Sequence, residues 1–264
     1  MRRQTAKAGN ILTLERIECI GVVDMFITFR KWTALYLLTL LLLFAGFAAI
    51  VWQGRAVNAS KNLEISQERD IVLVIDPGHG GFDGGALADD GTVEAQVNLA
   101  IGLRMEELAR LTGVETVMTR REDVALDNPD AGSVRQRKTS DLRNRVELVN
   151  RVPGGVLVSI HQNSLPEVRS VRGAQVFYND AEGSEELARA VQDALNTTIN
   201  DRPKEIKTAG KNIYLLCHTD VPAILVECGF LSNAQETQLL CTDGYQTKLA
   251  CTIFNAVMGH LQKN

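Results

Sequence analysis

Apolar and polar positions divide the chain into one long uncharged segment followed by a series of short elements. Residues 33–51 carry no charged side chain and are bounded by Trp32 and Trp52. A helix of this length, at about 1.5 Å per residue, spans the roughly 30 Å hydrocarbon core of a bilayer, and tryptophans favour its two interfaces. The pattern predicts a transmembrane anchor at residues 32–52.

The charges on the two flanks predict the orientation of this anchor. Residues 1–31 contain six Lys and Arg against three acids, whereas the polar residues 53–70 mix both signs. The positive-inside rule then places residues 1–31 in the cytoplasm, and a linker at 53–70 leads to a domain outside, in a single-pass protein of the cell membrane. A cleaved signal peptide is the alternative, but the apolar run and the segment before it are both long for one.

Beyond the linker, short β-branched runs alternate with stretches of helical periodicity. This alternation predicts a single α/β domain over residues 71–264, built around one largely buried sheet. The predicted strands are 71–75, 114–119, 156–161, 173–178, 212–216 and 223–227. The predicted helices are 92–111, 140–152, 184–199, 233–240 and 244–261, with a polar loop at 127–138 and Thr139 or Ser140 as the cap of the second helix.

Composition excludes nucleic acid as a partner but does not decide whether the cysteines form disulfides. The net charge is −4 and no basic cluster is present, which excludes a nucleic-acid-binding protein. The five cysteines form no C-x-x-C pair, so we expect buried free thiols. A Cys241–Cys251 or Cys217–Cys228 disulfide remains the alternative for an exported domain.

Three of the predicted strands lead to a residue that can bind metal or transfer a proton. IVLVIDPGHGG contains His79, GVLVSIH ends at His161 and PAILVE ends at Glu227, while Glu94 lies in the first turn of the helix after the glycine-rich loop. Strand ends of one sheet converge at an edge. Two imidazoles and a carboxylate are then the ligands of an open catalytic zinc site, with Glu227 as general base and acid. The alternative is structural: histidines at strand ends and an acid favoured by the helix dipole.

Four further polar residues are candidates for supporting roles. Asp76 and Asn163 are predicted either to orient the ligand loops or to serve simple turn chemistry. Arg143 and Arg145 are predicted on a solvated or ion-paired helix face, in preference to binding substrate carboxylates.

Four motifs in order resemble the zinc-dependent N-acetylmuramoyl-L-alanine amidases of the Amidase_3 family. They are DPGHGG, a glutamate that opens a helix, SIHQN and LVECGFLSN. The resemblance covers residues 71 to about 261 and implies a twisted, mostly parallel six-stranded sheet flanked by helices. It also implies Zn2+ bound by His79, Glu94 and His161, with Glu227 as the catalytic residue. The implied reaction is hydrolysis of the amide between N-acetylmuramic acid and L-alanine in peptidoglycan.

One segment is similar to a subgroup of this family. Residues 135–150, RQRKTSDLRNRVELVN, resemble the membrane-anchored amidases that act in spore-cortex maturation, where removal of stem peptides leads to muramic-δ-lactam. We expect that role here, with a general amidase of division or turnover and a non-catalytic wall-binding regulator as alternatives. A zinc peptidase that cuts within the stem peptide is a further alternative. The spacing from Glu94 to His161 leaves little room for a long inhibitory helix, so we expect control by an activating protein partner.

Overall fold

The protein, described by a computed structural model, divides into two compact units. They comprise Met1–Glu68 and Arg69–Asn264. The described residues are 36–46, 71–128 and 130–262.

In the first unit, residues 36–46 form a helix whose side chains are exposed. In the described part of the chain, no helix combines the length and the apolar character needed to cross a bilayer. The predicted anchor at 32–52 extends beyond residues 36–46 on both sides. The predicted cytoplasmic segment 1–31 and linker 53–70 lie outside the described residues.

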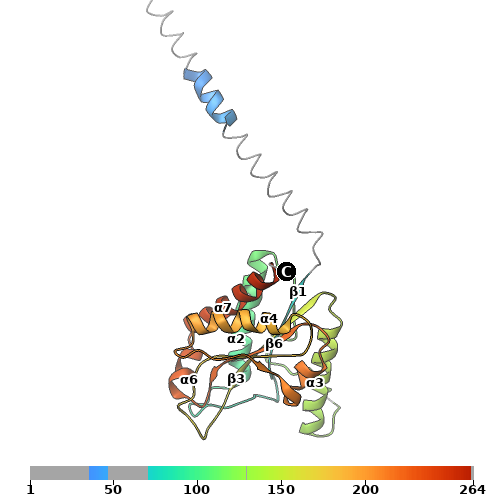
Figure 1. The fold of residues 1–264 in the computed structure, drawn as a ribbon. Helices are drawn as coiled ribbons and strands as arrows, with labels where there is room; N and C mark the ends of the chain where they lie inside the picture. Colours follow the sequence, from blue (N-terminus) through green and yellow to red (C-terminus); the bar gives the residue numbers. More distant parts are fainter. Residues whose placement is uncertain (1–35, 47–70, 129, 263–264) are drawn as a thin grey trace, which may run out of the picture. The chain divides into compact units, whose positions relative to one another are not determined.

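The second unit is built on one six-stranded sheet with the order β2-β1-β3-β6-β4-β5 (Figure 1). Neighbouring strands run parallel except for β4, which is antiparallel to β6. The predicted α/β class and the mostly parallel six-stranded sheet are therefore confirmed. The strands are β1 (Val72–Pro77), β2 (Thr116–Met118), β3 (Gly155–Asn163), β4 (Gln175–Tyr178), β5 (Lys207–Thr208) and β6 (Ala223–Phe230).

Helices cover both faces of this sheet, as Figure 1 shows. One face packs against α2 (Glu94–Thr112), α4 (Ser184–Thr198) and α7 (Asp243–Leu261). The other packs against α3 (Val134–Asn150) and the short α5 (Tyr214–His218), which follows the 3-10 turn η1 (Gly210–Asn212). The remaining helix, α6 (Ala234–Leu240), follows β6 and contacts it.

The side chains of β1 alternate between the two cores. Leu73 and Ile75 lie in the core below α2, α4 and α7, whereas Val74 lies in the core below α3 and α5, and all three are fully buried. Burial of each such side chain stabilises the fold by about 1.5–3 kcal/mol. A strand covered on both faces has no polar side, which is why its sequence is a continuous apolar run.

The predicted strand at 212–216 is wrong. These residues run from the end of η1 into α5, and the edge strand β5 is instead the exposed pair Lys207–Thr208. Leu215 and Leu216 are buried against the α3 face. A run of five residues is too short for its periodicity to distinguish a buried helical turn from a strand.

The predicted start of the helix at residue 140 is also wrong. Helix α3 begins at Val134, and the side chain of Ser133, rather than Thr139 or Ser140, caps it by accepting a hydrogen bond from the Gln136 N–H. The first two turns expose mainly polar side chains, so apolar spacing could not reveal them.

The four cysteines in the described part of the chain are free thiols, as predicted. Neither alternative disulfide forms. Cys228 is buried and Cys251 is half-buried, but Cys217 and Cys241 are exposed, contrary to the expected burial, because they lie in a short surface helix and at the end of another.

Candidate metal centre

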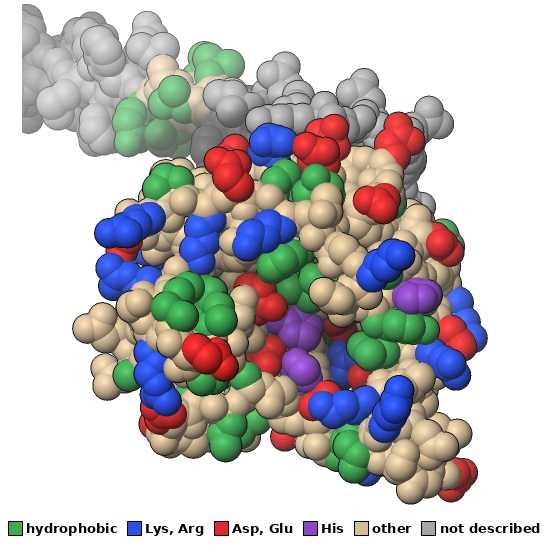
Figure 2. Space-filling view, turned by 60° about the horizontal axis from the view of Figure 1, so that its bottom comes forward, with side chains coloured by type: hydrophobic (Ala, Val, Ile, Leu, Met, Phe, Trp, Pro, Cys, Tyr) green, Lys and Arg blue, Asp and Glu red, His purple; other side chains and the backbone are tan. Residues whose placement is uncertain are grey.

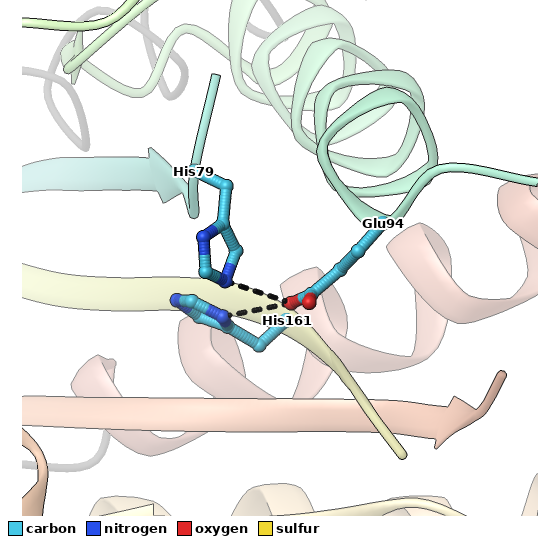
Figure 3. A group of neighbouring side chains, drawn as sticks. All are labelled: His79, Glu94 and His161. Carbon is cyan, nitrogen blue, oxygen red and sulfur yellow. Dashed lines mark hydrogen bonds and ion pairs between the residues drawn. The ribbon is translucent and has the colours of Figure 1, made fainter. Parts of the chain in front are cut away.

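Three side chains from three different elements meet at the carboxyl ends of β1 and β3 (Figure 3). His79 follows β1, Glu94 is the first residue of α2 and His161 lies near the end of β3. Glu94 Oε1 is 3.3 Å from His79 Nε2 and 3.0 Å from His161 Nδ1. The structure thus brings the three predicted ligand residues together.

The geometry of this triad fits a tetrahedral cation. Ligand atoms about 2.0–2.1 Å from a tetrahedral zinc ion lie about 3.3 Å from one another, close to both observed separations. One ligand atom from each residue lies within 4.8 Å of the others. Two nitrogens and one carboxylate oxygen are an open zinc ligand set that leaves one position for a fourth ligand.

The electrostatics of the triad favour positive charge. Burial lowers the pKa of His79, but hydrogen bonds to the carboxylates of Asp83 and Glu94 outweigh it and raise the pKa to about 9. Burial opposes ionisation of Glu94, yet hydrogen bonds from His161 and His79 hold its pKa well below its usual range. Carboxylates that stabilise protonated imidazoles nearby also stabilise a metal cation that replaces those protons.

Asp83 sets the orientation of the first imidazole. Its Oδ2 is 3.1 Å from His79 Nδ1, and its Oδ1 is 2.9 Å from Lys138 Nζ. A carboxylate on one ring nitrogen fixes the tautomer and leaves the other nitrogen, here Nε2, for a metal. Asp83 was not among the predicted site residues, although its position four residues after His79 was a usable signal.

Hydrogen bonds from the backbone and from Asn98 hold the Glu94 carboxylate in place. Oε2 accepts from Ala86 N at 2.8 Å, and Oε1 accepts from Gln162 N at 3.1 Å and from Asn98 Nδ2 at 3.3 Å. The Gln162 side chain in turn donates to Asn98 Oδ1 at 3.2 Å. Sequence reasoning missed both Asn98 and Gln162, although Asn98 lies one helical turn after Glu94.

Two glycines allow the ligands to approach the backbone. A Cβ atom at Gly78 would lie 2.1 Å from His161 Nε2, and one at Gly85 would lie 2.5 Å from Glu94 Oε2. The glycine-rich character of the loop is therefore required by the closeness of the side chains around it.

Glu227 lies on the strand next to His161. The two residues are register partners in the β3–β6 ladder, so their side chains leave the sheet on the same face. Glu227 Oε2 is buried and has no hydrogen-bond partner among the described residues. Burial, reinforced by the negative charge of Glu94 and opposed by His161, raises the pKa of Glu227 to about 7. A carboxyl group with that pKa can both accept and donate a proton near neutral pH.

The four predicted supporting residues have different environments. Asp76 is buried, but it accepts hydrogen bonds from Thr119, Ser159 and Arg145 rather than from an imidazole. Asn163 accepts a hydrogen bond from the next backbone N–H, which is turn chemistry. Arg143 is exposed, as predicted.

Arg145 is ion-paired, which confirms one form of the prediction, but the alternative of a solvated face is wrong for it. Its side chain is 2% exposed and pairs with Asp76 and Asp141. Asp141 and Val149 lie four residues before and four residues after Arg145 on α3. These three residues form the buried stripe of the helix, which therefore mixes charged and apolar side chains. A stripe of this composition gives no apolar signal in the sequence.

The centre is partly exposed to solvent. Figure 2 shows histidine side chains at the bottom of a surface hollow, beside acidic side chains. The side chains of His79 and His161 are 25% and 19% exposed, so a ligand in solution can reach them.

Comparison with known proteins agrees with this geometry. The chain is 32% identical over 187 residues to a germination-specific N-acetylmuramoyl-L-alanine amidase of Bacillus subtilis (strain 168), covering 71% of this chain and 78% of the relative. Its structure is similar to that of the CwlD amidase from Clostridioides difficile, solved in complex with the GerS lipoprotein. That similarity has a TM-score of 0.70 and 35% identity, covering 74% of this chain and all of the other.

A second solved structure and a family match point the same way. The amidase AmiC2 of Nostoc punctiforme has a TM-score of 0.62 and 32% identity, with 73% of this chain and 98% of that one covered. Residues 73–258 match the family described as N-acetylmuramoyl-L-alanine amidase. The chain therefore belongs to the N-acetylmuramoyl-L-alanine amidases of the Amidase_3 family, hydrolases that act on the peptidoglycan of the cell wall.

Proposed function

We propose that the chain performs this amidase reaction with zinc bound by His79, Glu94 and His161 and with Glu227 as the catalytic acid and base. One observation carries the proposal: a triad with zinc-like spacing lies beside the carboxyl group of Glu227, one oxygen of which is buried and has no hydrogen-bond partner in the part of the chain that the structure describes. The donor set fits zinc better than calcium or magnesium, which prefer oxygen ligands.

The roles of the side chains follow from their positions. Zinc, when bound, polarises the scissile carbonyl and lowers the pKa of the attacking water. Glu227 accepts the proton of that water at Oε2 and then donates it to the nitrogen of the departing L-alanine. Asp83 holds the proton on His79 Nδ1, so that Nε2 faces Glu94. The N–H groups of Ala86 and Gln162 keep the Glu94 carboxylate from rotating.

We infer that the substrate is the peptidoglycan of the spore cortex, from which the enzyme strips stem peptides before muramic-δ-lactam forms. Support comes from the similarity to a germination-specific amidase and to the CwlD amidase, each about one-third identical to this chain. The CwlD structure contains the GerS lipoprotein, so an extracytoplasmic lipoprotein is the class of activating partner that we propose here. The predicted anchor at 32–52 would hold the domain at the outer face of the cytoplasmic membrane.

Mass spectrometry of digested peptidoglycan tests the reaction. We expect muramic acid with a free lactyl carboxylate together with stems that begin at L-alanine, and both products disappear with a chelator and return with zinc. Glu227→Gln should reduce the rate by about 10²–10⁴-fold while zinc binding persists, and the exposed control Glu186→Gln should leave both unchanged. Cleavage within the stem, or full activity of Glu227→Gln, would contradict the proposed chemistry.

Genetic deletion tests the cortex assignment separately. Spores that lack the protein should contain no muramic-δ-lactam in their cortex. Normal amounts of the lactam would assign the amidase to division or turnover instead.

A further inference from the structure

Two buried arginines hold the loop that carries His79. Arg120, which follows β2, donates from Nε to the Pro77 carbonyl at 2.8 Å and from Nη2 to the Gly78 carbonyl at 3.0 Å. Arg145, on α3, donates from Nη1 to the Pro77 carbonyl at 3.1 Å and from Nη2 to the His79 carbonyl at 2.7 Å. Three successive carbonyl groups thus accept from a guanidinium, and we call Arg120 and Arg145 the guanidinium cradle.

The cradle brings two positive charges into the interior, and two acids balance them. Arg145 Nη1 is 2.6 Å from Asp76 Oδ1, and its Nε is 2.8 Å from Asp141 Oδ2. These carboxylates raise the pKa of Arg145 although burial opposes it. Burial and the neighbouring Arg145 charge lower the pKa of Arg120 to about 10. Buried ion pairs of this kind often stabilise a fold no more than apolar residues of similar volume do, so stability alone does not account for the cradle.

The backbone of His79 is in a conformation that needs support. Its φ is 61°, in the left-handed region, and every other described residue with positive φ is a glycine. Side chains with a Cβ atom are strained there, and the conformation persists only where the surroundings impose it. The contact of Arg145 with the His79 carbonyl is such a restraint, at the residue whose imidazole belongs to the triad.

We propose that Arg145 is a positioning residue for the metal centre: by holding the His79 carbonyl, it fixes the left-handed backbone and so directs His79 Nε2 toward Glu94. The inference rests on the proposed function, because it takes His79 as a ligand. Lysine cannot replace the guanidinium, since one ammonium group cannot span Asp76, Asp141 and the His79 carbonyl at once.

Zinc titration of Arg145→Lys tests the inference. The full-length chain is used in detergent, with a chromophoric chelator as competitor. We expect the zinc affinity to fall by about 10–100-fold, the range typical of residues that orient metal ligands. The visible spectrum of the Co2+-substituted protein should change, and kcat should fall with KM nearly unchanged.

Two control variants separate positioning from general stability. Val149→Ala, on the same buried stripe of α3, removes packing without touching the loop and should lower Tm while leaving zinc affinity unchanged. Arg143→Lys, on the exposed face of α3, should change neither the Tm nor the zinc affinity. If Arg145→Lys does not fold, Asp141→Asn replaces it, because this change keeps the arginine but removes the partner of its Nε.

The outcomes distinguish failure of this inference from failure of the proposed function. If His79→Ala binds zinc as tightly as the wild type, His79 is not a ligand, and the proposed function and the inference both fail. If His79→Ala loses zinc but Arg145→Lys, or Asp141→Asn in its place, keeps wild-type affinity and cobalt spectrum, the inference alone is overturned. Equal loss of zinc affinity in Val149→Ala would reduce Arg145 to a structural residue and also overturn it.

Discussion

Among the described glycines, Gly78 leaves the least room for a Cβ atom, because the ring of His161 lies against it, and alanine at position 78 would collide with that ring. The added Cβ would lie 2.1 Å from Nε2, 2.2 Å from Cε1 and 2.7 Å from Cδ2 of the imidazole. Since ordinary van der Waals contact begins near 3.4 Å, the ring must retreat by about 1.3 Å. The backbone at Gly78 is outside the left-handed region, so alanine adds no strain of its own.

This displacement is large compared with the tolerance of a metal site. Ligand distances hold to within about 0.2 Å, so His161 Nδ1 would leave coordinating range. Because a misplacement of about 1 Å can cost 10²-fold in rate, we expect Gly78→Ala to lose about 100-fold or more in both zinc affinity and kcat/KM. The atoms that must move are at the end of a side chain. The free energy of unfolding without metal should therefore change by less than about 1 kcal/mol.

Zinc titration measures the expected loss of affinity, and denaturation with and without chelator measures the effect on the free energy of unfolding. A given zinc concentration should raise the Tm of the wild type by more than it raises that of Gly78→Ala, whereas the two metal-free proteins should unfold together. Gly259→Ala is the matched control, because a Cβ there has no atom within 4 Å and the residue lies in α7. It should keep full zinc affinity and gain about 0.5–1 kcal/mol of stability. Wild-type zinc affinity in Gly78→Ala would refute the placement of His161 as a ligand.

Two further predictions concern the groups behind the ligands. Burial alone would raise the pKa of Asp76, but Arg145 and hydrogen bonds from Ser159 and Thr119 lower it to about 2. The resulting stabilisation of about 2 kcal/mol is complete above the unfolded pKa near 4 and is lost as the pH falls toward 2. Urea denaturation should show that slope in the wild type and a flatter one in Asp76→Asn, and an equal slope in both would contradict the ion pair. Asn98→Ala removes one donor to the Glu94 carboxylate and should lower zinc affinity about tenfold with KM unchanged. Competition titration measures this, and unchanged affinity would exclude an orienting role for Asn98.

Local sequence was sufficient to predict the strands that lead to the site. The uninterrupted apolar run before Asp76 suits only an element buried on both faces, and it forms β1. Because β1, β3 and β6 run parallel, their carboxyl ends share one edge of the sheet. Convergence of His79, His161 and Glu227 therefore followed from the order of residues within each strand.

Local sequence failed where a segment was short or where burial depended on distant partners. Residues 212–216 gave too few positions for a period, and tertiary packing made them helical. The residues next to Arg145 in the sequence are mainly polar and charged, so local sequence predicted an exposed side chain. Arg145 is buried because Asp76, 69 residues earlier in the chain, neutralises it.

The sequence by itself determined the donors of the candidate centre and the strands that lead to His79, His161 and Glu227, because residue type and strand pattern are local properties. It did not determine where two of these strands end, since β3 and β6 continue to Asn163 and Phe230, past the predicted ends at His161 and Glu227. Only the tertiary structure decided that Glu94 Oε1 lies 3.0–3.3 Å from the two imidazoles, that Asp83 orients His79 and that the guanidinium cradle holds the loop behind it. Those distances depend on the strand register and on how α2 and α3 pack against the sheet. Both are set by contacts between residues far apart in the chain.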